Sequence, residues 1–359
     1  MIFSSYPKKY YLKHKKNILD NIKKTLDSGN YINSENVKQF ENDFANYLGV
    51  KYVIGVGNAT DALYIILKSM GIGINHEVIL PSHTAIATAI SVSNTGAKPI
   101  FIDIGDDYNI DTNLIPSKIN KKTMAIICVH IYGQPCDLTA LKKISKIYNV
   151  PLVEDCSQSS GSEYNNKKTG SFGLASCHSF FPTKNLATYG DGGAISTNSK
   201  SLYLKMIKYR EYGWGKNRNA EVVGINSRLD EIHASILRYN LKNLDNNINF
   251  RIKIAEYYLK NIKNNKILLP KKIVNRKNSY HLFVIKLKNR NKLLEILKKE
   301  GFLLGVHYRL PAHKQKIYIK NNLTLINTEN ISNNSISLPI YPGIELNQLK
   351  KITKIINNF

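Results

Sequence analysis

The stretch that decides the fold runs from Ser176 to Ala194 and reads SCHSFFPTKNLATYGDGGA. A short apolar and aromatic segment, Leu174 to Phe181, leads into a loop that holds a single lysine, Lys184, and a glycine cluster follows. A lysine just past a buried strand can be partly desolvated, which lowers the pKa of its amine and frees it to act as a nucleophile or base. The alternative is a surface lysine, because lysines are seldom fully buried, but the neighbouring sequence argues against it.

A carboxylate partner for this lysine lies upstream in the sequence. Pro151 to Val153 reads as a buried strand that ends in Glu154 and Asp155. Ligands of α/β folds bind at the carboxyl ends of parallel strands. An aspartate there and a lysine in a nearby loop are the pair that pyridoxal phosphate (PLP) enzymes need. The lysine holds the cofactor as a Schiff base, and the aspartate keeps the pyridine nitrogen protonated so that the ring can act as an electron sink.

The rest of the chain alternates predicted strands and helices, which indicates parallel βαβ units. We expect further strands at 51–56, from 77, at 99–103 and at 124–129, and helices at 138–148, 202–212 and, as one long helix, from about 224 to 258. An amphipathic start carries Ile18, Ile22 and Leu26 at helical spacing. From about 260 the pattern indicates a small α/β module, with a strand at 282–287, a helix at 292–299 and a strand at 303–306.

Length and composition indicate a globular protein that works in the cytoplasm. The chain has 359 residues, enough for two domains that share one large core. No apolar run reaches the roughly 18 residues of a membrane span, and the N-terminus has no signal-peptide pattern. The 4 cysteines fall in or next to predicted strands without the spacing of a zinc site, so we expect reduced thiols and no metal.

The formal net charge of +25 raises the possibility of nucleic-acid binding. The lysines, however, are scattered among many Asn and Ile residues, and no helix-turn-helix, zinc-finger or RNA-binding signature accompanies them. A basic surface would also attract a nucleotide diphosphate, whose phosphates are anionic. The charge alone therefore does not indicate a protein that binds nucleic acid.

A candidate phosphate site lies in Gly55 to Leu63, which reads GVGNATDAL. The pattern is a strand, a glycine turn and the start of a helix. The N-terminus of a helix presents free backbone N–H groups and the positive end of the helix dipole, which suit a phosphate. Many α/β loops look like this one, so the motif alone is weak.

Four ordered segments together resemble one family. They are VEDCSQSSG (153–161), SFFPTKN (179–185), GDGGA (190–194) and INSRLDEIHA (225–234). They are similar to segments of the DegT/DnrJ/StrS sugar-nucleotide aminotransferases, which have PLP fold type I, the aspartate aminotransferase-like fold. The resemblance covers Asn30 to Tyr341. It implies a large PLP-binding α/β domain (26–245) with a mostly parallel seven-stranded sheet flanked by helices, a small C-terminal α/β domain (246–359), and an N-terminal segment (1–25) associated with the small domain.

The resemblance implies a set of site residues. Lys184 and Asp155 would be catalytic and would also bind the cofactor. The other expected cofactor contacts are Gln158 near the phenolic oxygen, Ser179, Thr60 and the Ala59 backbone at the phosphate, and Asn226, which would reach the phosphate of a neighbouring subunit. The alternatives are a polar loop residue for Gln158, a strand-edge serine for Ser179 and a helix N-cap for Asn226.

The sequence departs from the family pattern at three places, of which the first is Ala59, where many members have glycine. Ala85 stands where members usually carry an aromatic residue stacked on the pyridine ring. His83, or an aromatic residue from elsewhere, could cover the ring instead; His83 could also be an ordinary loop residue. The segment from His307 to His313, HYRLPAH, resembles the family's HYPxPxH segment with Arg309 in place of a proline. The resemblance implies that Tyr308 and His313 contact the sugar nucleotide, with a structural role as the alternative for His313.

The activity that the resemblance implies is transamination. An amino donor, glutamate, would convert PLP to pyridoxamine phosphate, and the amine would pass to a keto group of a nucleotide-linked deoxysugar for surface polysaccharide or other glycan biosynthesis. The GQP segment (133–135) and the EDCSQ spelling favour a 3-keto over a 4-keto sugar. We expect a homodimer with shared active sites, without membrane or nucleic-acid partners.

Four other functions remain as alternatives. A sugar dehydratase of the same family would carry histidine in place of Lys184, and an amino-acid lyase of the same fold would not match the SFFPTKN and NSRLDE segments. A non-catalytic protein with this fold, or a basic protein that binds nucleic acid, would not need both Lys184 and Asp155.

Overall fold

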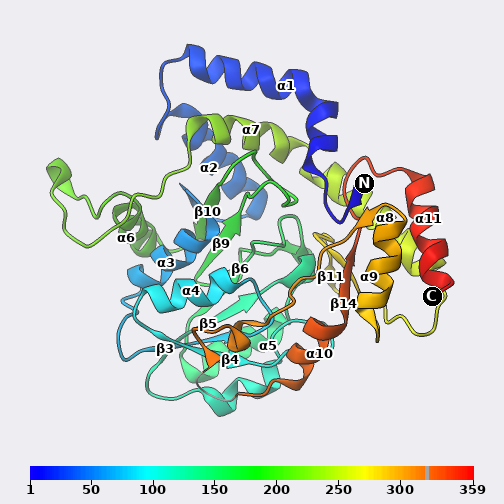
Figure 1. Ribbon diagram of the computed structural model, residues 1–359. Coiled ribbons are helices and arrows are strands. Elements are labelled where there is room, and N and C mark those ends of the chain that lie inside the picture. The colour runs from blue at the N-terminus through cyan, green and yellow to red at the C-terminus, as the bar shows by residue number, and fades with distance from the viewer. Residues whose placement is uncertain (320–322) are drawn as a thin grey trace.

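The computed structural model describes residues 1–319 and 323–359. Its centre is a seven-stranded sheet in the order β2-β10-β9-β6-β5-β3-β4 (Figure 1). The strands are β2 (Tyr52–Val56), β3 (Glu77–Pro81), β4 (Lys98–Ile102), β5 (Thr123–Val129), β6 (Leu152–Asp155), β9 (Ala175–Ser179) and β10 (Gly193–Thr197). Only β10 runs antiparallel to its neighbours, and the remaining pairs are parallel. The sequence prediction of a mostly parallel α/β sheet is confirmed.

Helices cover both faces of this sheet, because successive residues of a strand point to opposite sides. On β5, Ile127 packs in the same core cluster as the helix residues Leu63 and Ile66, whereas Ile126 packs with Leu138 and Leu141 on the other face. The helices of this unit are α2 (Glu35–Leu48), α3 (Ala59–Ser69), α4 (Ile86–Asn94), α5 (Leu138–Tyr148), α6 (Lys200–Arg210) and α7 (Glu231–Lys242). The carboxyl ends of β5, β6 and β9 therefore meet at one edge between two layers of helices.

The chain begins with a short strand and a long helix that lie apart from the sheet. Strand β1 (Ile2–Phe3) pairs with β13 (Phe302–Leu303), and α1 (Pro7–Asp27) lies above α7 (Figure 1). The prediction for the buried face of this helix is only partly right, because Ile18 is buried while Leu26 is 48% exposed. The helix packs along a narrow line, so much of its apolar face remains uncovered.

The single helix predicted from 224 to 258 is wrong. Residues before Asp230 form isolated bridges, Glu211 with Asn226 and Ile32 with Asp230, so α7 begins only at Glu231. A second helix, α8 (Leu244–Asn261), follows after a break at Asn243, whose side-chain amide donates to the Tyr239 carbonyl. An asparagine that bonds to the local backbone competes with the helix. The break lets α7 pack in the large core and α8 reach the C-terminal core.

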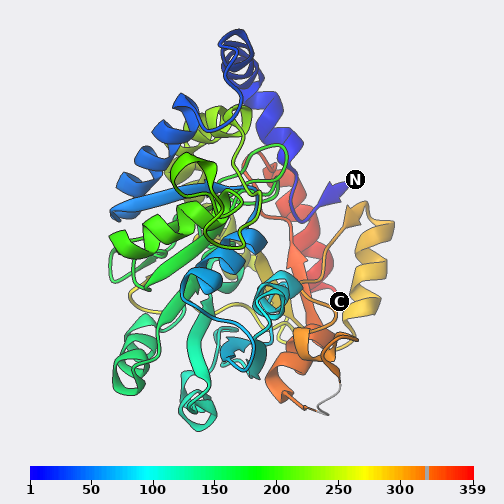
Figure 2. The same ribbon diagram turned by 90° about the vertical axis from the view of Figure 1, so that its left-hand side faces the viewer.

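The C-terminal elements form a separate core cluster beside the central sheet (Figure 2). Strands β12 (Phe283–Lys286) and β14 (Ser335–Leu338) pair antiparallel, and α9 (Arg290–Lys299), α10 (Ile326–Asn334) and α11 (Leu346–Asn357) accompany them. The predicted strand at 303–306 is shorter than expected and ends at Leu303. A small sheet of β7 (Glu163–Tyr164), β8 (Lys167–Lys168) and β11 (Arg276–Lys277) completes the described strands.

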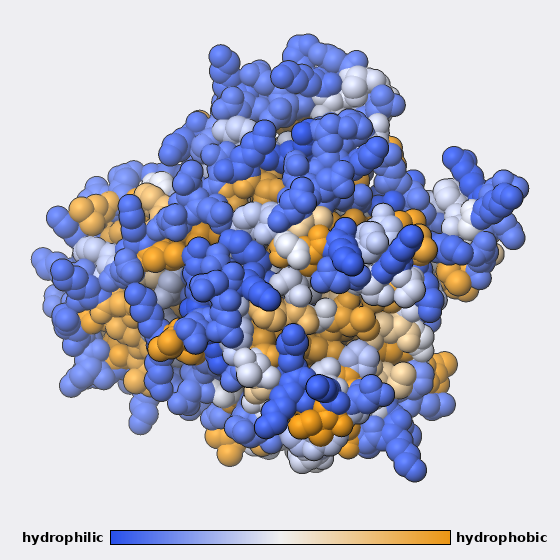
Figure 3. Space-filling model, turned by 180° about the vertical axis from the view of Figure 1, so that it is seen from behind, coloured by the Kyte–Doolittle hydropathy of each residue, from blue (hydrophilic) through white to orange (hydrophobic). Residues whose placement is uncertain are grey.

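The surface is largely polar. Hydrophilic residues cover most of the face opposite to that in Figure 1, with hydrophobic residues in separate patches (Figure 3). Within residues 1–319 and 323–359, no helix combines the length and apolar character that a bilayer span requires.

Candidate active site

A cavity of about 250 Å³ lies at the carboxyl edge of the sheet, and we call it the cofactor cavity. It brings together most of the residues that the sequence singled out. Its lining includes Lys184, Asp155, Gln158, Ser179, Ala59 and Thr60. Three segments far apart in the chain thus meet as the strand order requires.

Lys184 lies in the loop between β9 and β10. Its backbone N–H donates to the Phe181 carbonyl at 2.9 Å, and the next side chain, Asn185, donates to the Ser279 carbonyl at 3.0 Å, so both ends of the loop segment are tied down. Burial lowers the pKa of Lys184 to about 8, although the nearby Asp155 carboxylate works in the opposite direction. A lysine with this pKa is neutral in about a tenth of the molecules at pH 7, far more often than an ordinary lysine.

Asp155 ends β6 and is held by bonds to both carboxylate oxygens. Its Oδ1 accepts from the Ser157 N–H at 3.0 Å, and its Oδ2 accepts from the Thr88 hydroxyl at 2.9 Å. Thr84 in turn bonds to Thr88 at 2.8 Å. The two threonines therefore orient the carboxylate toward the cavity that they also line. Sequence reasoning missed them, and the short TAIAT spacing at the start of α4 was the available signal.

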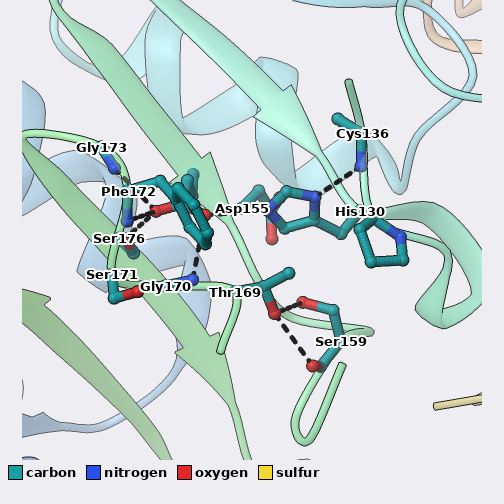
Figure 4. A network of polar contacts seen from close by, with 12 residues as sticks. His130, Cys136, Asp155, Ser159, Thr169, Gly170, Ser171, Phe172, Gly173 and Ser176 are labelled. Carbon is teal, nitrogen blue, oxygen red and sulfur yellow. Dashed lines mark hydrogen bonds and ion pairs between the residues drawn. The ribbon is translucent and has the colours of Figure 1, made fainter. Parts of the chain in front are cut away.

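Glu154, next to Asp155, does not line the cavity and belongs to a buried hydrogen-bond network. Figure 4 shows its surroundings, with His130 on one side and Gly170 to Gly173 on the other. Its carboxylate accepts from His130 Nε2 at 3.0 Å, from the N–H groups of Gly170 at 2.9 Å and of Phe172 and Gly173 at 2.8 Å, and from the Ser176 hydroxyl at 3.2 Å. Burial alone would raise the pKa of Glu154, but these donors outweigh it and lower the pKa to about 2. The network fixes the end of β6, and with it Asp155, against the loop before β9.

His130 is buried beside Glu154 in this network. Its Nδ1 accepts from the Cys136 N–H at 3.0 Å, so the ring proton is on Nε2, which donates to Glu154. Both nitrogens are therefore engaged inside the protein. These contacts indicate a structural role for Glu154 and His130.

The other end of the cavity is suited to a phosphate. Helix α3 begins at Ala59, Asn58 caps it by accepting from the Asp61 N–H at 2.9 Å, and the N–H groups of Ala59 and Thr60 belong to the first turn, which has no intrahelical acceptors. Ser179 lines the same end. A Cβ on Gly193 would lie 2.5 Å from the Asn58 carbonyl carbon, so only glycine lets β10 approach this loop.

A serine that the sequence did not single out braces this phosphate loop. Ser227 Oγ accepts from the Gly57 N–H at 3.0 Å and donates to Asp61 Oδ2 at 2.7 Å. Asn226, the preceding residue, is not among those lining the cofactor cavity. Its interpretation as a helix N-cap is wrong, because Asp230 occupies the N-cap position of α7 and Asn226 forms a bridge with Glu211.

Gln158 connects the cavity to the segment that resembles HYPxPxH. Its Oε1 accepts from the Tyr132 N–H at 2.7 Å, and its Nε2 donates to the Tyr308 hydroxyl at 2.8 Å. Tyr308 therefore lies beside the cofactor cavity. The His83 ring bonds to the Tyr132 hydroxyl and packs edge-on to Tyr308.

Two further predicted contacts, besides Asn226, do not line the cavity. His83 is buried and does not line the cavity, and burial lowers its pKa to about 3, so the ring is neutral. His313 is also buried, with Nδ1 bonded to the Ser82 hydroxyl at 2.6 Å and Nε2 to Glu329 at 3.1 Å. Both of its nitrogens are engaged within the subunit, which favours the structural alternative for His313.

The donors and acceptors of the cofactor cavity fit pyridoxal phosphate. One end offers free N–H groups and hydroxyls for a phosphate, and the other offers the Asp155 carboxylate for a protonated ring nitrogen. Lys184, with its lowered pKa, lines the same cavity. These are the groups by which a protein binds the cofactor and tunes its electronics.

Comparisons with known proteins agree with this geometry. The family model described as DegT/DnrJ/EryC1/StrS aminotransferase family matches residues 13–357. The chain is 39% identical over 350 residues to a dTDP-3-amino-3,6-dideoxy-alpha-D-galactopyranose transaminase of Aneurinibacillus thermoaerophilus, covering 97% of this chain and 96% of that protein. Among solved structures it is similar to S. venezuelae DesV in complex with a ketimine intermediate, at 32% identity and a TM-score of 0.96, covering 100% of this chain and 97% of that one.

A second solved structure names the cofactor. It is NtdA from Bacillus subtilis with bound cofactor PMP, at 28% identity and a TM-score of 0.91, covering 96% of this chain and 82% of that one. The chain therefore belongs to the DegT/DnrJ/EryC1/StrS aminotransferase family, whose members use pyridoxal phosphate.

Proposed function

We propose that this protein transfers an amino group from an amino acid, glutamate, to the keto group of a nucleotide-linked keto-deoxysugar, at carbon 3. The observation that carries the proposal is Lys184, with its lowered pKa, in one cavity with Asp155 and the phosphate loop. The name of the A. thermoaerophilus relative places its amino group at carbon 3, which supports the same position here. The amino sugar would then enter glycan biosynthesis.

Each part of the cofactor cavity has one task in this proposal. When bound, pyridoxal phosphate supplies a carbonyl that carries the amino group and a ring that withdraws electrons from the bond that breaks. The first turn of α3 and Ser179 hold the phosphate, and Asp155, oriented by Thr88, holds a proton at the ring nitrogen. Lys184 would hold the cofactor through its carbonyl carbon C4′, and its amine would act as the acid and base that moves a proton between Cα of the amino donor and that carbon. Gln158 lies beside the ring.

The nearest alternative to this activity is that of a sugar dehydratase. A dehydratase of this family carries histidine at the position of Lys184. Mass spectrometry of the product separates the two, because transamination exchanges oxygen for nitrogen whereas dehydration removes water. No described contact favours a nucleic-acid partner over the nucleotide-linked sugar.

The substrate is tested by incubating the PLP-loaded enzyme with glutamate and a dTDP-linked 3-keto or 4-keto 6-deoxyhexose. The expected result is 2-oxoglutarate and an amino sugar, formed fastest from the 3-keto compound. Faster conversion of the 4-keto compound would reject the position of the keto group. If the PLP-loaded enzyme converts neither the 3-keto nor the 4-keto sugar, whether the sugar is linked to dTDP or to UDP, the proposed activity is rejected.

We infer that the active unit is a homodimer in which Asn226 completes the neighbour's phosphate site. Leu12, Leu19 and Leu26 lie seven residues apart on α1 and are 57%, 43% and 48% exposed. Such an apolar stripe suits a second copy of the chain. Asn226 lies next to Ser227, which braces the phosphate loop from outside the cavity.

Complementation tests the dimer, provided that Asn226→Ala alone is inactive. Inactive Lys184→Ala and Asn226→Ala chains are mixed under conditions in which subunits exchange. A two-fold dimer with shared sites should recover activity at about a quarter of the parent value, because half of the dimers are mixed and each has one intact site. Verified exchange without recovery, or a fully active monomer, would reject the shared site.

The cellular location is part of the same proposal. All cysteines are free and buried thiols: Cys128, Cys136, Cys156 and Cys177. Reduced thiols are typical of cytosolic proteins, so we infer that the enzyme acts in the cytoplasm.

A further inference from the structure

A groove of about 860 Å³ lies on the C-terminal part of the molecule, and we call it the basic groove. Its walls come from the segment at 266–268, the end of β12 with the turn at 287–289, the first half of α9, the second half of α10 and the two residues after α11. None of these residues lines the cofactor cavity. In Figures 1 and 2, α9 and the C-terminus lie at the right, apart from α7 and most of α1 at the top. The groove is therefore a surface separate from the site already described.

Two extended segments direct side chains into this groove. The Leu268 N–H donates to the Lys286 carbonyl at 2.8 Å, and the Lys286 N–H donates to the Leu268 carbonyl at 2.9 Å. Their chain neighbours Ile267 and Leu287 are buried in the C-terminal core cluster. Because successive residues of an extended chain point to opposite sides, Leu268 and Lys286 point away from that core. At the outer ends of the same two segments, Lys266 and Lys288 are exposed and line the same groove.

Helix α9 adds another wall with the same character. Lys292 and Ile296 lie four residues apart, so they share one face of the helix, and both line the groove. The first turn of α9 has no acidic residue and no side chain caps it. The free N–H groups and the positive dipole end of that turn add to the charge of the lysines. The acidic residue of this helix, Glu295, does not line the groove.

The lysines of the groove are not neutralised by the protein. Lysines elsewhere in the C-terminal part are paired, since Lys272 lies 3.3 Å from Glu256 and Lys351 lies 2.9 Å from Glu300. No Asp or Glu side chain lines the groove. Within residues 1–319 and 323–359, its four lysines form no ion pair: Lys266, Lys286, Lys288 and Lys292. Four like charges around one groove favour a partner of the opposite charge.

Between the lysines the groove has an apolar floor. Leu268 is 55% exposed, and Ile296 and Phe359 are half-buried. A single exposed apolar side chain is ordinary, but an apolar patch rimmed by charged residues is typical of an interaction surface. A partner that supplied only negative charge would leave this floor uncovered.

We propose that the basic groove is a docking site for an acidic amphipathic segment of a partner protein. Carboxylates of the segment pair with the four lysines, and apolar side chains between those carboxylates cover Leu268, Ile296 and Phe359. Sites for small molecules enclose about 70–90% of their ligand. Most side chains of the basic groove are exposed, so it suits a segment that lies along it.

Other macromolecules match the groove less well. A nucleic acid would use the lysines, but its phosphates would leave the apolar floor uncovered. A second copy of this chain carries the same formal net charge of +25 and would be repelled from a basic surface.

The test is fluorescence anisotropy of the PLP-loaded enzyme with two labelled peptides of equal charge. One is built from Glu-Glu-Leu repeats and the other from Glu-Glu-Ser repeats. The parent should bind the leucine peptide more tightly than the serine peptide, and added salt should weaken both, because exposed charges are screened. Replacing Lys266, Lys286, Lys288 and Lys292 together by glutamine should weaken the leucine peptide about tenfold or more.

A matched charge control separates the groove from the net charge of the protein. It replaces four exposed lysines of the large α/β unit by glutamine, namely Lys118, Lys121, Lys122 and Lys146, none of which lines the groove. This variant loses the same charge and should bind the leucine peptide within about twofold of the parent. Both variants should keep the absorbance of bound cofactor and the Tm of the parent, since the residues lie outside the cofactor cavity.

Leu268→Ser tests the apolar floor without a change of charge. It should weaken the leucine peptide about threefold or more and leave the serine peptide unchanged. Leu346→Ser is its control, because Leu346 is also 55% exposed and does not line the groove.

The remaining outcomes would overturn the docking site. Equal weakening by the two lysine variants would mean that the peptide follows net charge and not the groove. Equal affinity of the parent for the two peptides would mean that the groove attracts anions without using its floor. A labelled oligothymidylate that binds more tightly than the leucine peptide, and loses affinity in the groove variant alone, would assign the surface to nucleic acid. No binding of the leucine peptide to the parent would reject the proposal outright.

Discussion

Lys184 lines the cofactor cavity and also a second cavity, of about 50 Å³, and the two cavities are built in different ways. The cofactor cavity takes its walls from the ends of neighbouring strands and the helix starts that follow them, between Asn58 and Gly192. The second cavity is assembled from segments as far apart as Ser5 and Pro342. A sheet edge collects short motifs in a fixed order, whereas a space between layers collects single residues that no local pattern connects. The first kind of site can therefore be predicted from sequence and the second cannot.

The change that affects both cavities most is Lys184→Ala. It should lower turnover at least about 10²-fold, because the residue that moves the proton is lost. The fold should remain, since the truncation removes a desolvated amine and leaves both loop anchors in place. Borohydride reduction of the loaded parent followed by peptide mapping is the direct measurement. Cofactor found on any other lysine would show that this assignment is wrong.

Asp155→Asn affects the cofactor cavity alone. The amide keeps the shape but cannot hold the ring nitrogen protonated by charge, so cofactor should still bind while kcat falls. Loss of such a charge-assisted bond costs roughly 1.5–3 kcal/mol, or about 10- to 150-fold. Thr88→Val is the companion variant, because Thr88 donates to Asp155 Oδ2, and should cause a smaller loss. Asp155→Asn activity within a few-fold of the parent would exclude the electron-sink role.

The sequence predicted the sheet and the core of the cofactor cavity because both follow local patterns. Asp155 and Ser179 end strands, and Lys184 follows the strand that Ser179 ends, so parallel pairing brings them together. Ser227 and Thr88 were missed because their partners, Gly57 and Asp155, lie far away in the chain.

Other predictions failed or remain open for a related reason. The break at Asn243 was not predicted because the helical periodicity of the sequence continues across it. It depends on α7 and α8 packing in different cores. His313 matches the last residue of the HYPxPxH segment, but its side chain here points inward and bonds to Ser82 and Glu329. The domain boundaries at 25/26 and 245/246 and the roles of the individual site residues stay predictions.

The lowered pKa of Lys184 predicts a pH dependence that tests whether its amine is desolvated. The neutral amine attacks the cofactor, so the rate of PLP capture by the apoenzyme should rise with pH through about 8 and level off above it. Well below that pH the rate should rise about tenfold per unit, as the neutral fraction does. Stopped-flow absorbance measures it, with N-acetyl-lysine as the control. A profile that keeps rising towards 10.5, like the control, would mean that Lys184 is not desolvated.

The smallest expected effect comes from Ala85→Phe, at the wall of the cofactor cavity. Ala85 lines the cavity, and its methyl group cannot supply the ring stacking that the family's usual aromatic residue provides. His83 does not line the cavity, so within the described part of the subunit it is not a substitute. A ring at position 85 should tighten PLP binding by roughly 0.5–1.5 kcal/mol, or about two- to tenfold in Kd.

The control for this change is Ala85→Leu, which adds bulk without a π-face. Stacking predicts that phenylalanine tightens PLP binding in fluorescence titrations of the apoenzyme and that leucine does so less or not at all. Equal tightening by both would mean that filled volume matters and stacking does not. Weaker binding in both would mean that the space beside Ala85 is already occupied when the cofactor is bound. The partner subunit is then the source to examine, because the Asn226 segment is proposed to reach the same cavity from there.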